Sequence, residues 1–289
     1  MEERVGNFTG ARDLYSASLA IEPTAPTLVA YALLELRFPS ATTTNNTTEN
    51  NNNNNEQTVQ VVQTTENNNS NNKVNNYDYV KRLFEEALLI DPRHGPAYNA
   101  YGKAELRHGT VEEAKRIFER GVQANCADAA SIYHGYAKME LSLGNVDTAR
   151  ELLLKGRDVV QRQDVGMDSQ HRERAIFLSH TLGMLELNSN RPSQAYGVFM
   201  DGMERYGNSS QLLLGAALCE VKLGKQESAR ALFEKSVVND NHHAQAWQAW
   251  GVMEMRAGNI STARKLFDCG IKSAPKHGAL WQAYGTSCF

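Results

Sequence analysis

A glutamate recurs along the chain at nearly constant spacing, and this repetition limits the possible folds more than any other feature. Copies of a stretch such as MEMRAGNISTARKLF contain Glu2, Glu35, Glu105, Glu140, Glu186, Glu220 and Glu254. The last five glutamates are 35, 46, 34 and 34 residues apart, so a unit of about 34 residues recurs and one copy is longer by twelve (46 − 34). Seven tandem copies predict a repeat protein whose neighbouring units stack on one another.

Each copy has the pattern of two helices joined by a tight turn. Apolar residues recur every three or four positions in both halves, which is the helical period. Between the halves stands Gly6, Gly109, Gly144, Gly224 or Gly258, or else Asn190, where a helix end needs the left-handed backbone conformation. Small residues three before and nine after the glutamate, and a large apolar residue thirteen after it, let the two helices pack closely. We therefore expect an all-α fold built from stacked helix pairs.

Two features of the repeat resemble the half-a-TPR, or HAT, repeat family: the glutamate in the first helix and an Ala-Arg pair that opens the second. The pair stands at Ala11-Arg12, Ala149-Arg150, Ala229-Arg230 and Ala263-Arg264. The resemblance implies a TPR-like α-solenoid, a right-handed superhelix of antiparallel helix pairs, over residues 1–289. Within the family, MEMRAGNISTARKLF and WQAWGVMEMRAGN look most like plant and algal chloroplast HAT proteins that bind and stabilise photosystem II transcripts.

One segment interrupts the repeats. Residues 39–76 are rich in asparagine and offer little apolar surface to bury, so we expect a disordered insertion at the tip of one helical hairpin. A long flexible loop at such a tip costs only about 1 to 3 kcal/mol more than a short one. The chain opens inside a first helix, and its end, ALWQAYGTSCF, starts an eighth copy. We therefore expect a fragment of a longer array.

Residue patterns typical of catalysis or metal binding are missing from the sequence. There is no phosphate-binding loop, no nucleophile elbow and no CxxC pair. The cysteines occupy different places in the repeat and fit small buried positions: Cys126, Cys219, Cys269 and Cys288. His94, His243 and His277 lie one or more repeats apart, whereas a metal needs ligands that converge. We expect no enzyme, no metal site and no cofactor.

The repeated glutamate is explained by a basic residue that follows it in the sequence. Ten residues after the glutamate, in repeat register, stands Arg12, Lys81, Lys115, Arg150, Arg230 or Arg264, with Tyr196 in one copy. Buried charges are tolerated when they are paired, so we expect structural ion pairs, either across one hairpin or to the neighbouring repeat. The residues expected to form them are Glu105, Lys115, Glu140, Arg150, Glu220, Arg230, Glu254 and Arg264.

A line of basic residues is expected on the inner surface of the first helices. Two places after the glutamates stand Arg4, Arg37, Arg107, Lys222 and Arg256, and two places before them stand Lys103 and Lys138. A polar row lies one turn earlier, at Asn99, His134, His180, Gln248 and Gln282. This arrangement suits a single RNA strand whose phosphates contact the line of basic side chains while its nucleobases meet the polar row. The alternative is that each base only stabilises a helix C-terminus through the helix dipole.

The resemblance favours RNA binding over the alternative that the basic residues only stabilise helix C-termini. It implies a protein that stabilises or matures chloroplast mRNA by binding single-stranded RNA in the concave groove. The alternative is a protein–protein scaffold of a nuclear splicing or polyadenylation complex, with other proteins of the complex as partners. The net charge of −3 does not by itself indicate nucleic-acid binding. No apolar run is long enough to span a membrane, and no targeting peptide is visible. We expect an intracellular protein, in the chloroplast by resemblance or alternatively in the nucleus.

Overall fold

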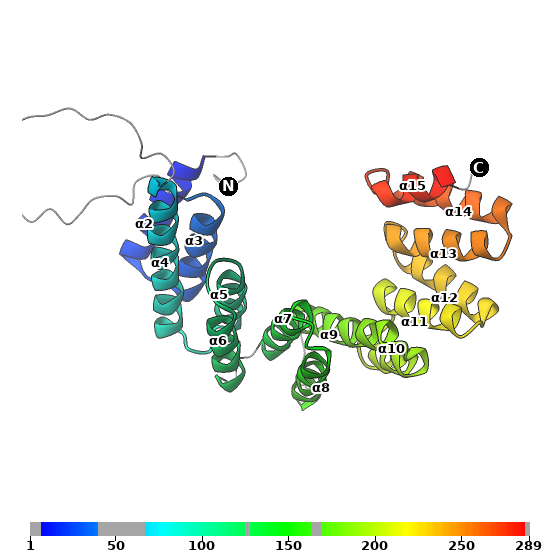
Figure 1. The fold of residues 1–289 in the computed structure, drawn as a ribbon, viewed down its shortest axis with the longest axis horizontal. Coiled ribbons are helices and arrows are strands. Elements are labelled where there is room, and N and C mark those ends of the chain that lie inside the picture. Colours follow the sequence, from blue (N-terminus) through cyan, green and yellow to red (C-terminus); the bar gives the residue numbers. More distant parts are fainter. Residues whose placement is uncertain (1–6, 40–66, 125, 127, 163–168, 287–289) are drawn as a thin grey trace, which may run out of the picture. The chain divides into compact units, whose positions relative to one another are not determined.

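The computed structural model describes residues 7–39, 67–124, 126, 128–162 and 169–286, and all regular structure in these residues is helical (Figure 1). Glu2, Arg4, Gly6 and Cys288 lie outside them. The helices are α2 (Phe8–Ile21), α3 (Ala25–Arg37), α4 (Asn67–Ile90), α5 (Gly95–His108), α6 (Val111–Gln123), α7 (Ala129–Ser142), α8 (Val146–Arg162), α9 (Ser169–Asn188), α10 (Pro192–Tyr206), α11 (Ser210–Lys222), α12 (Gln226–Asn239), α13 (Ala244–Arg256), α14 (Ile260–Ser273) and α15 (Gly278–Thr286).

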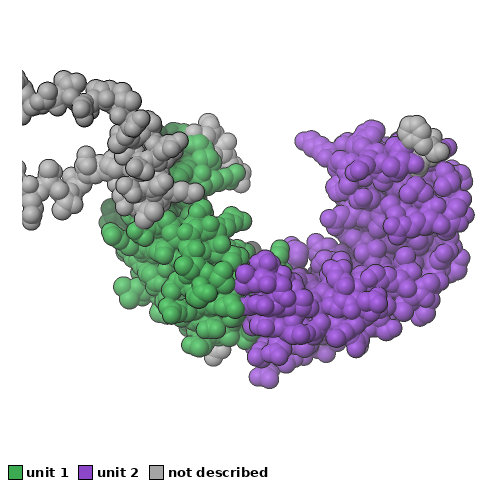
Figure 2. Space-filling model, viewed as in Figure 1, with its two compact units in different colours: residues 1–139 green, residues 140–289 purple. Residues whose placement is uncertain are grey.

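These helices form the pairs that the repeat predicts, from α3–α4 to α13–α14. The chain divides into two compact units, residues 1–139 and 140–289, with the boundary inside α7 (Figure 2). Within the units, α3, α9, α11 and α13 each pack against the second helix of their own pair and contact the next pair. The predicted all-helical α-solenoid is confirmed. The longer copy contains α8 and α9, which are both longer than most other helices of the array.

A buried phenylalanine holds most of the hairpins together, and Leu153 takes its place on α8. Phe118, Phe199 and Phe267 are fully buried on second helices and lie against glycines of the paired first helices. A Cβ atom on Gly251 would lie 2.3 Å from the ring of Phe267, and Gly102 and Gly183 face their rings similarly. Any larger residue at these glycines would have to displace an aromatic ring in a close-packed core.

Aromatic rings also join one hairpin to the next. Phe84 on α4 stacks on Tyr101 of α5, with ring centroids 5.1 Å apart, and Phe233 on α12 stacks on Trp250 of α13 at 6.3 Å. Phe118 makes both kinds of contact, because it packs against Gly102 of its own hairpin and stacks on Tyr136 of the following repeat, with ring centroids 5.4 Å apart. Such stacked pairs add to the burial of apolar area.

The turns inside the hairpins are of two kinds. Gly144, Gly224 and Gly258 have φ angles of 83°, 76° and 82°, and Asn190 has 59°, as expected for left-handed helix ends. Gly109 departs from this expectation, because its φ is −115°. A Cβ atom there would lie 1.6 Å from Oε2 of Glu105, so this glycine leaves space for the repeat glutamate.

Helix α4 corrects one boundary of the asparagine-rich tract. The helix begins at Asn67, so residues 67–76, which were expected to be disordered, are helical, while residues 40–66 lie outside the described residues. The physical reason is visible at the end of the tract. The side chain of Asn76 is buried and donates a hydrogen bond to the backbone oxygen of Glu35, 3.2 Å away, which ties α4 to its partner helix α3.

Candidate functional site

The repeat glutamates are the most regular polar feature of the described structure. Glu254 is 1% exposed and accepts two hydrogen bonds from Arg230, Nε–Oε1 at 2.7 Å and Nη2–Oε2 at 3.0 Å. Asn259, in the turn that follows Glu254, donates a third at 2.7 Å. These donors, Arg230 foremost, lower the pKa of Glu254 even though burial opposes the shift. The carboxylate is therefore held as a buried, fully bonded anion.

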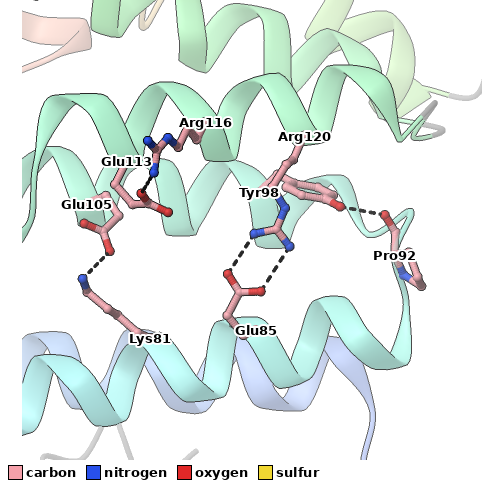
Figure 3. Close-up of polar contacts among 8 residues, drawn as sticks. All are labelled: Lys81, Glu85, Pro92, Tyr98, Glu105, Glu113, Arg116 and Arg120. Atoms are coloured by element: carbon pink, nitrogen blue, oxygen red, sulfur yellow. Dashed lines mark hydrogen bonds and ion pairs between the residues drawn. The ribbon is translucent and has the colours of Figure 1, made fainter.

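The pairing runs from one repeat to the next. Arg230 belongs to the repeat before Glu254, and the same direction joins Lys81 to Glu105 at 3.0 Å (Figure 3). Arg150–Glu186 and Arg12–Glu35 follow it, each at 2.6 Å. We call these four contacts the inter-repeat pairs. Of the two arrangements that the sequence allowed, they take the one to the neighbouring repeat, because a second helix packs between two first helices and its base reaches the following one.

Some of the predicted pairing residues are placed differently. Glu140 accepts a hydrogen bond from Asn145 at 2.6 Å, and the ion pairs of Lys115 and Arg264 stay predictions. Glu220 does not pair with Arg230, whose described acidic partners are Glu254 and Glu227.

One repeat lacks the inter-repeat pair. The base that would reach Glu220 is replaced by Tyr196, and Glu220 is only 3% exposed. Its nearest described cation is Lys225 of its own turn, at 3.8 Å, and its Oε2 accepts no hydrogen bond from the residues that the structure describes. A buried carboxylate with incomplete bonding is costly, so this repeat boundary is less stabilised than the one at Glu254, where Arg230 bonds to both carboxylate oxygens.

A donor in the turn was missed by the sequence analysis. Five residues after the glutamate stand Asn145, Arg191, Lys225 and Asn259, each directed at the carboxylate of its own hairpin. The signal was available, because a hydrogen-bond donor recurs at this one register in otherwise variable turns. The full unit is therefore a carboxylate held between its own turn and the previous repeat.

Among the predicted RNA-binding residues, the structure brings three cations together in unit 1. Lys103 and Arg107 lie one turn apart on α5, and Lys138 lies on α7; all three are exposed, and we call them the basic cluster. The pKa of Lys103 is lowered, first by desolvation and then by the charges of Lys138 and Arg107. None of the three has an acidic partner among the described residues.

The polar row adjoins this cluster. Asn99 lies one turn before Lys103 on α5, and His134 lies one turn before Lys138 on α7. The two helices touch here, since a Cβ atom on Gly135 would lie 2.2 Å from Oδ1 of Asn99. That oxygen is buried and accepts no hydrogen bond within the described structure. The buried oxygen lies at the contact between α5 and α7, so the exposed part of this surface consists of the three positive charges.

The other candidates of the basic line differ from one another. Lys222 donates from Nζ to the backbone oxygen of Leu187 at the end of α9, 2.9 Å away, which is the helix-capping role that was the alternative. The guanidinium of Arg37 lies over the ring of Phe38, 5.4 Å from its centroid. Arg256 is exposed.

In the polar row of unit 2, Gln248 is half-buried. His180 is also half-buried, and its pKa is lowered by desolvation and by His243.

The structure gives a mixed result for the cysteines. Cys126 and Cys219 are buried as expected, and burial raises their pKa to about 11 and about 12. Cys269 is exposed, which corrects the expectation of a buried position. No group of three or more potential metal ligands occurs in the described part of the chain. None of the described helices combines the length and the hydrophobicity needed to cross a bilayer.

The fold defines the class of protein. Stacked helix pairs with small, aromatic and glycine positions in a 34-residue register form a TPR-like helical repeat scaffold. Residues 99–158, which include the whole basic cluster, match the family model described as tetratricopeptide repeat. A comparison with curated protein sequences found no match.

Solved structures share this fold at low sequence identity. A chain of the APC/C hetero-tetramer Cut9–Hcn1 is 13% identical with a TM-score of 0.56, and the match covers 100% of this chain and 48% of that one. A tetratricopeptide repeat protein from Parabacteroides merdae is 12% identical with a TM-score of 0.52, covering 100% and 95%. PilF of Pseudomonas aeruginosa is 16% identical with a TM-score of 0.51, covering 74% and 91%. The chain thus spans about half of the Cut9–Hcn1 chain that it matches.

Proposed function

We propose that this protein binds single-stranded RNA, with the basic cluster on α5 and α7 as the main contact for its phosphates. The observation that supports the proposal is the gathering of Lys103, Arg107 and Lys138 without an acidic partner among the described residues. Cations held close together repel one another, and this repulsion adds to desolvation, the larger cause, in lowering the pKa of Lys103. A bound anion would relieve it, so the surface favours a polyanionic ligand.

The contrast with unit 2 localises the proposed contact. Two places before each repeat glutamate, where α5 and α7 carry Lys103 and Lys138, unit 2 carries Met184, Leu218 and Val252. These residues occupy the same register, so the fold itself does not require lysine there. We therefore propose a phosphate-binding surface on unit 1, formed by Lys103, Arg107 and Lys138.

The proposed role is passive. RNA that lies on the scaffold is shielded from exonucleases and kept from pairing with itself, and the protein needs no catalytic group. This finer function, together with a chloroplast location, is suggested by the resemblance to HAT proteins that stabilise photosystem II transcripts. Imaging a fluorescent fusion of the full-length protein tests the location, and a nuclear signal would favour the scaffold of a splicing or polyadenylation complex.

A salt titration tests the binding itself. The affinity for a short fluorescein-labelled single-stranded RNA, measured by anisotropy, should fall with salt at a slope of about −0.7 per phosphate contact, or about −2 for the cluster. Replacing Lys103, Arg107 and Lys138 together with Gln should abolish most of this slope. The matched control replaces three exposed cations elsewhere, Arg116, Lys155 and Lys272, with Gln and removes the same net charge.

Two outcomes would refute RNA binding by this surface. The first is an equal loss of affinity in both triple variants, which would mean that only net charge matters. The second is displacement of the RNA by poly-glutamate at equal charge concentration, which would make the basic cluster a general anion site. In that case an acidic protein segment becomes the better partner, as the scaffold alternative requires.

A further inference from the structure

A second surface lies in unit 2, on the side of the second helices. Between α10 and α12, over α11, is a cavity of about 500 Å³. Met200 and Met203 of α10 form one wall, Leu232 of α12 the other, and Leu213 of α11 the floor. Met200 is 42% exposed although it is a large apolar residue. Apolar and polar side chains share the surface of the cavity, because it is also lined by Tyr196, Glu204, Asn208 and Lys235.

The equivalent groove in unit 1 is filled and closed by the chain's own residues. Between α4 and α6, Arg120 donates two hydrogen bonds to Glu85, at 2.9 and 3.1 Å, and so bridges the two walls (Figure 3). Tyr98 of α5 lies beneath this bridge, and its hydroxyl donates to the backbone oxygen of Pro92 at 3.0 Å. An aromatic ring and an ion pair therefore complete this groove.

Repeat register shows what the open groove lacks. Lys235 of α12 stands at the position of Arg120, but Met200 stands at the position of Glu85, so the bridging carboxylate is missing. Leu213 stands at the position of Tyr98, so α11 contributes no aromatic ring, although Tyr196 of α10 lines the cavity. The open groove thus retains the cation of the closed one without the two groups that would cover it.

Two charged residues at the rim are available to a ligand. Lys235 lies on the α12 side and Glu204 on the α10 side, and both line the cavity and are exposed. Neither has an ion-pair partner among the described residues. A ligand that satisfies both must present a carboxylate to α12 and a cation or hydrogen-bond donor to α10.

We propose that this groove, which we call the α10–α12 groove, binds a segment of another protein that supplies the missing groups. The segment carries an aromatic side chain that lies over Leu213, a carboxylate that pairs with Lys235, and a basic residue towards Glu204. Methionine walls adapt to the shape of an inserted ring, and aromatic anchors in such pockets dominate many interfaces. The site is independent of the proposed RNA surface, because its residues all belong to unit 2.

Methionine-methyl NMR of the full chain tests the proposal with two capped peptides, Lys-Gly-Trp-Gly-Asp and Asp-Gly-Trp-Gly-Lys. At least one of them should shift the Met200 and Met203 signals saturably, with a dissociation constant on the order of 1 mM. The signal of Met253, which is buried on α13, serves as the internal reference. Replacing Trp in the peptide with Ala, or Asp with Lys, should weaken binding about tenfold or more.

Two protein variants complete the test. Met200→Glu restores the carboxylate that Glu85 provides in the closed groove, so it should pair with Lys235 and weaken peptide binding at least tenfold, read at Met203. Lys235→Gln, at an exposed position that cannot unfold the repeat, should abolish the preference for Asp over Lys in the peptide. Absence of a saturable shift at about 5 mM peptide, or unchanged binding by both variants, would overturn the proposal and leave the RNA-binding proposal untouched.

Discussion

The direction of the inter-repeat pairs can be tested by comparing two glutamates that differ only in their partners. Glu254 and Glu220 occupy the same register and are buried to 1% and 3% exposure. Arg230 lies ten residues after Glu220, but its guanidinium bonds to Glu254. Double-mutant cycles with Arg230→Met, combined with Glu254→Gln or with Glu220→Gln, measure each coupling directly.

The structure sets the expected magnitudes. Breaking a fully buried ion pair costs about 3 to 5 kcal/mol. The side chain of Arg230 is 28% exposed, and Asn259 still bonds to Glu254 when the arginine is removed, so both moderate the loss. We expect a coupling energy of about 2 kcal/mol between Arg230 and Glu254. For Arg230 and Glu220, which share no contact, we expect less than about 0.5 kcal/mol.

Urea unfolding followed by circular dichroism gives the free energies of the variants. Repeat arrays unfold through nearest-neighbour coupling, so hydrogen exchange of the α12 and α13 amides provides a local measurement alongside it. Both should report the larger coupling for Glu254. A coupling to Glu220 that equals or exceeds the coupling to Glu254 would mean that the pair closes one hairpin instead of joining two repeats, and the assignment of direction would be wrong.

Three further predictions concern the same carboxylates. Tyr196→Arg should supply the missing partner of Glu220 and raise stability by about 1 to 2 kcal/mol, and a lower melting temperature would show that this carboxylate is already satisfied. Gly109→Ala should lower the free energy of unfolding by about 1 to 3 kcal/mol or more through overpacking, because its Cβ would displace Oε2 of Glu105. An unchanged melting temperature would contradict that contact. The lowered pKa of Glu254 gives stability that is present above the ordinary glutamate pKa of about 4.3 and is lost as pH falls through the folded-state value. Acid unfolding should therefore be shallower for Glu254→Gln, and equal pH dependence in the two proteins would refute this.

The helices and their pairing could be predicted because the same local pattern occurs many times. Apolar periodicity, turn glycines and the glutamate–phenylalanine spacing each recur, and a repeat unit cannot bury its apolar faces alone. The register identified Gly102 and Gly251 as small positions and Phe118 and Phe267 as large ones, and the structure brings each pair into contact. The start of α4 was not predicted, because the prediction of disorder rested on the asparagine-rich composition of the tract. The buried hydrogen bond of Asn76 depends on one residue and cannot be recognised from composition.

The sequence leaves open whether each ion pair forms within one hairpin or between two neighbouring repeats. Both arrangements put the base at a similar height to the glutamate, and only the way in which helices pack decides between them. The basic cluster shows a similar limit. Lys103, Arg107 and Lys138 were each identified by register, but their proximity depends on how α5 lies against α7, where Asn99 meets Gly135.

The positions where the repeats disagree carry the functional proposals. A residue that recurs in every repeat is explained by packing or by the inter-repeat pairs, because each unit has the same structural need. Lys103 and Lys138 stand where unit 2 has Met184, Leu218 and Val252, and Met200 and Leu213 stand where unit 1 has Glu85 and Tyr98. In both cases the fold tolerates the other residue at the same register, so stability does not require the difference. The two units share one scaffold, and these departures give one unit a basic surface and the other the α10–α12 groove.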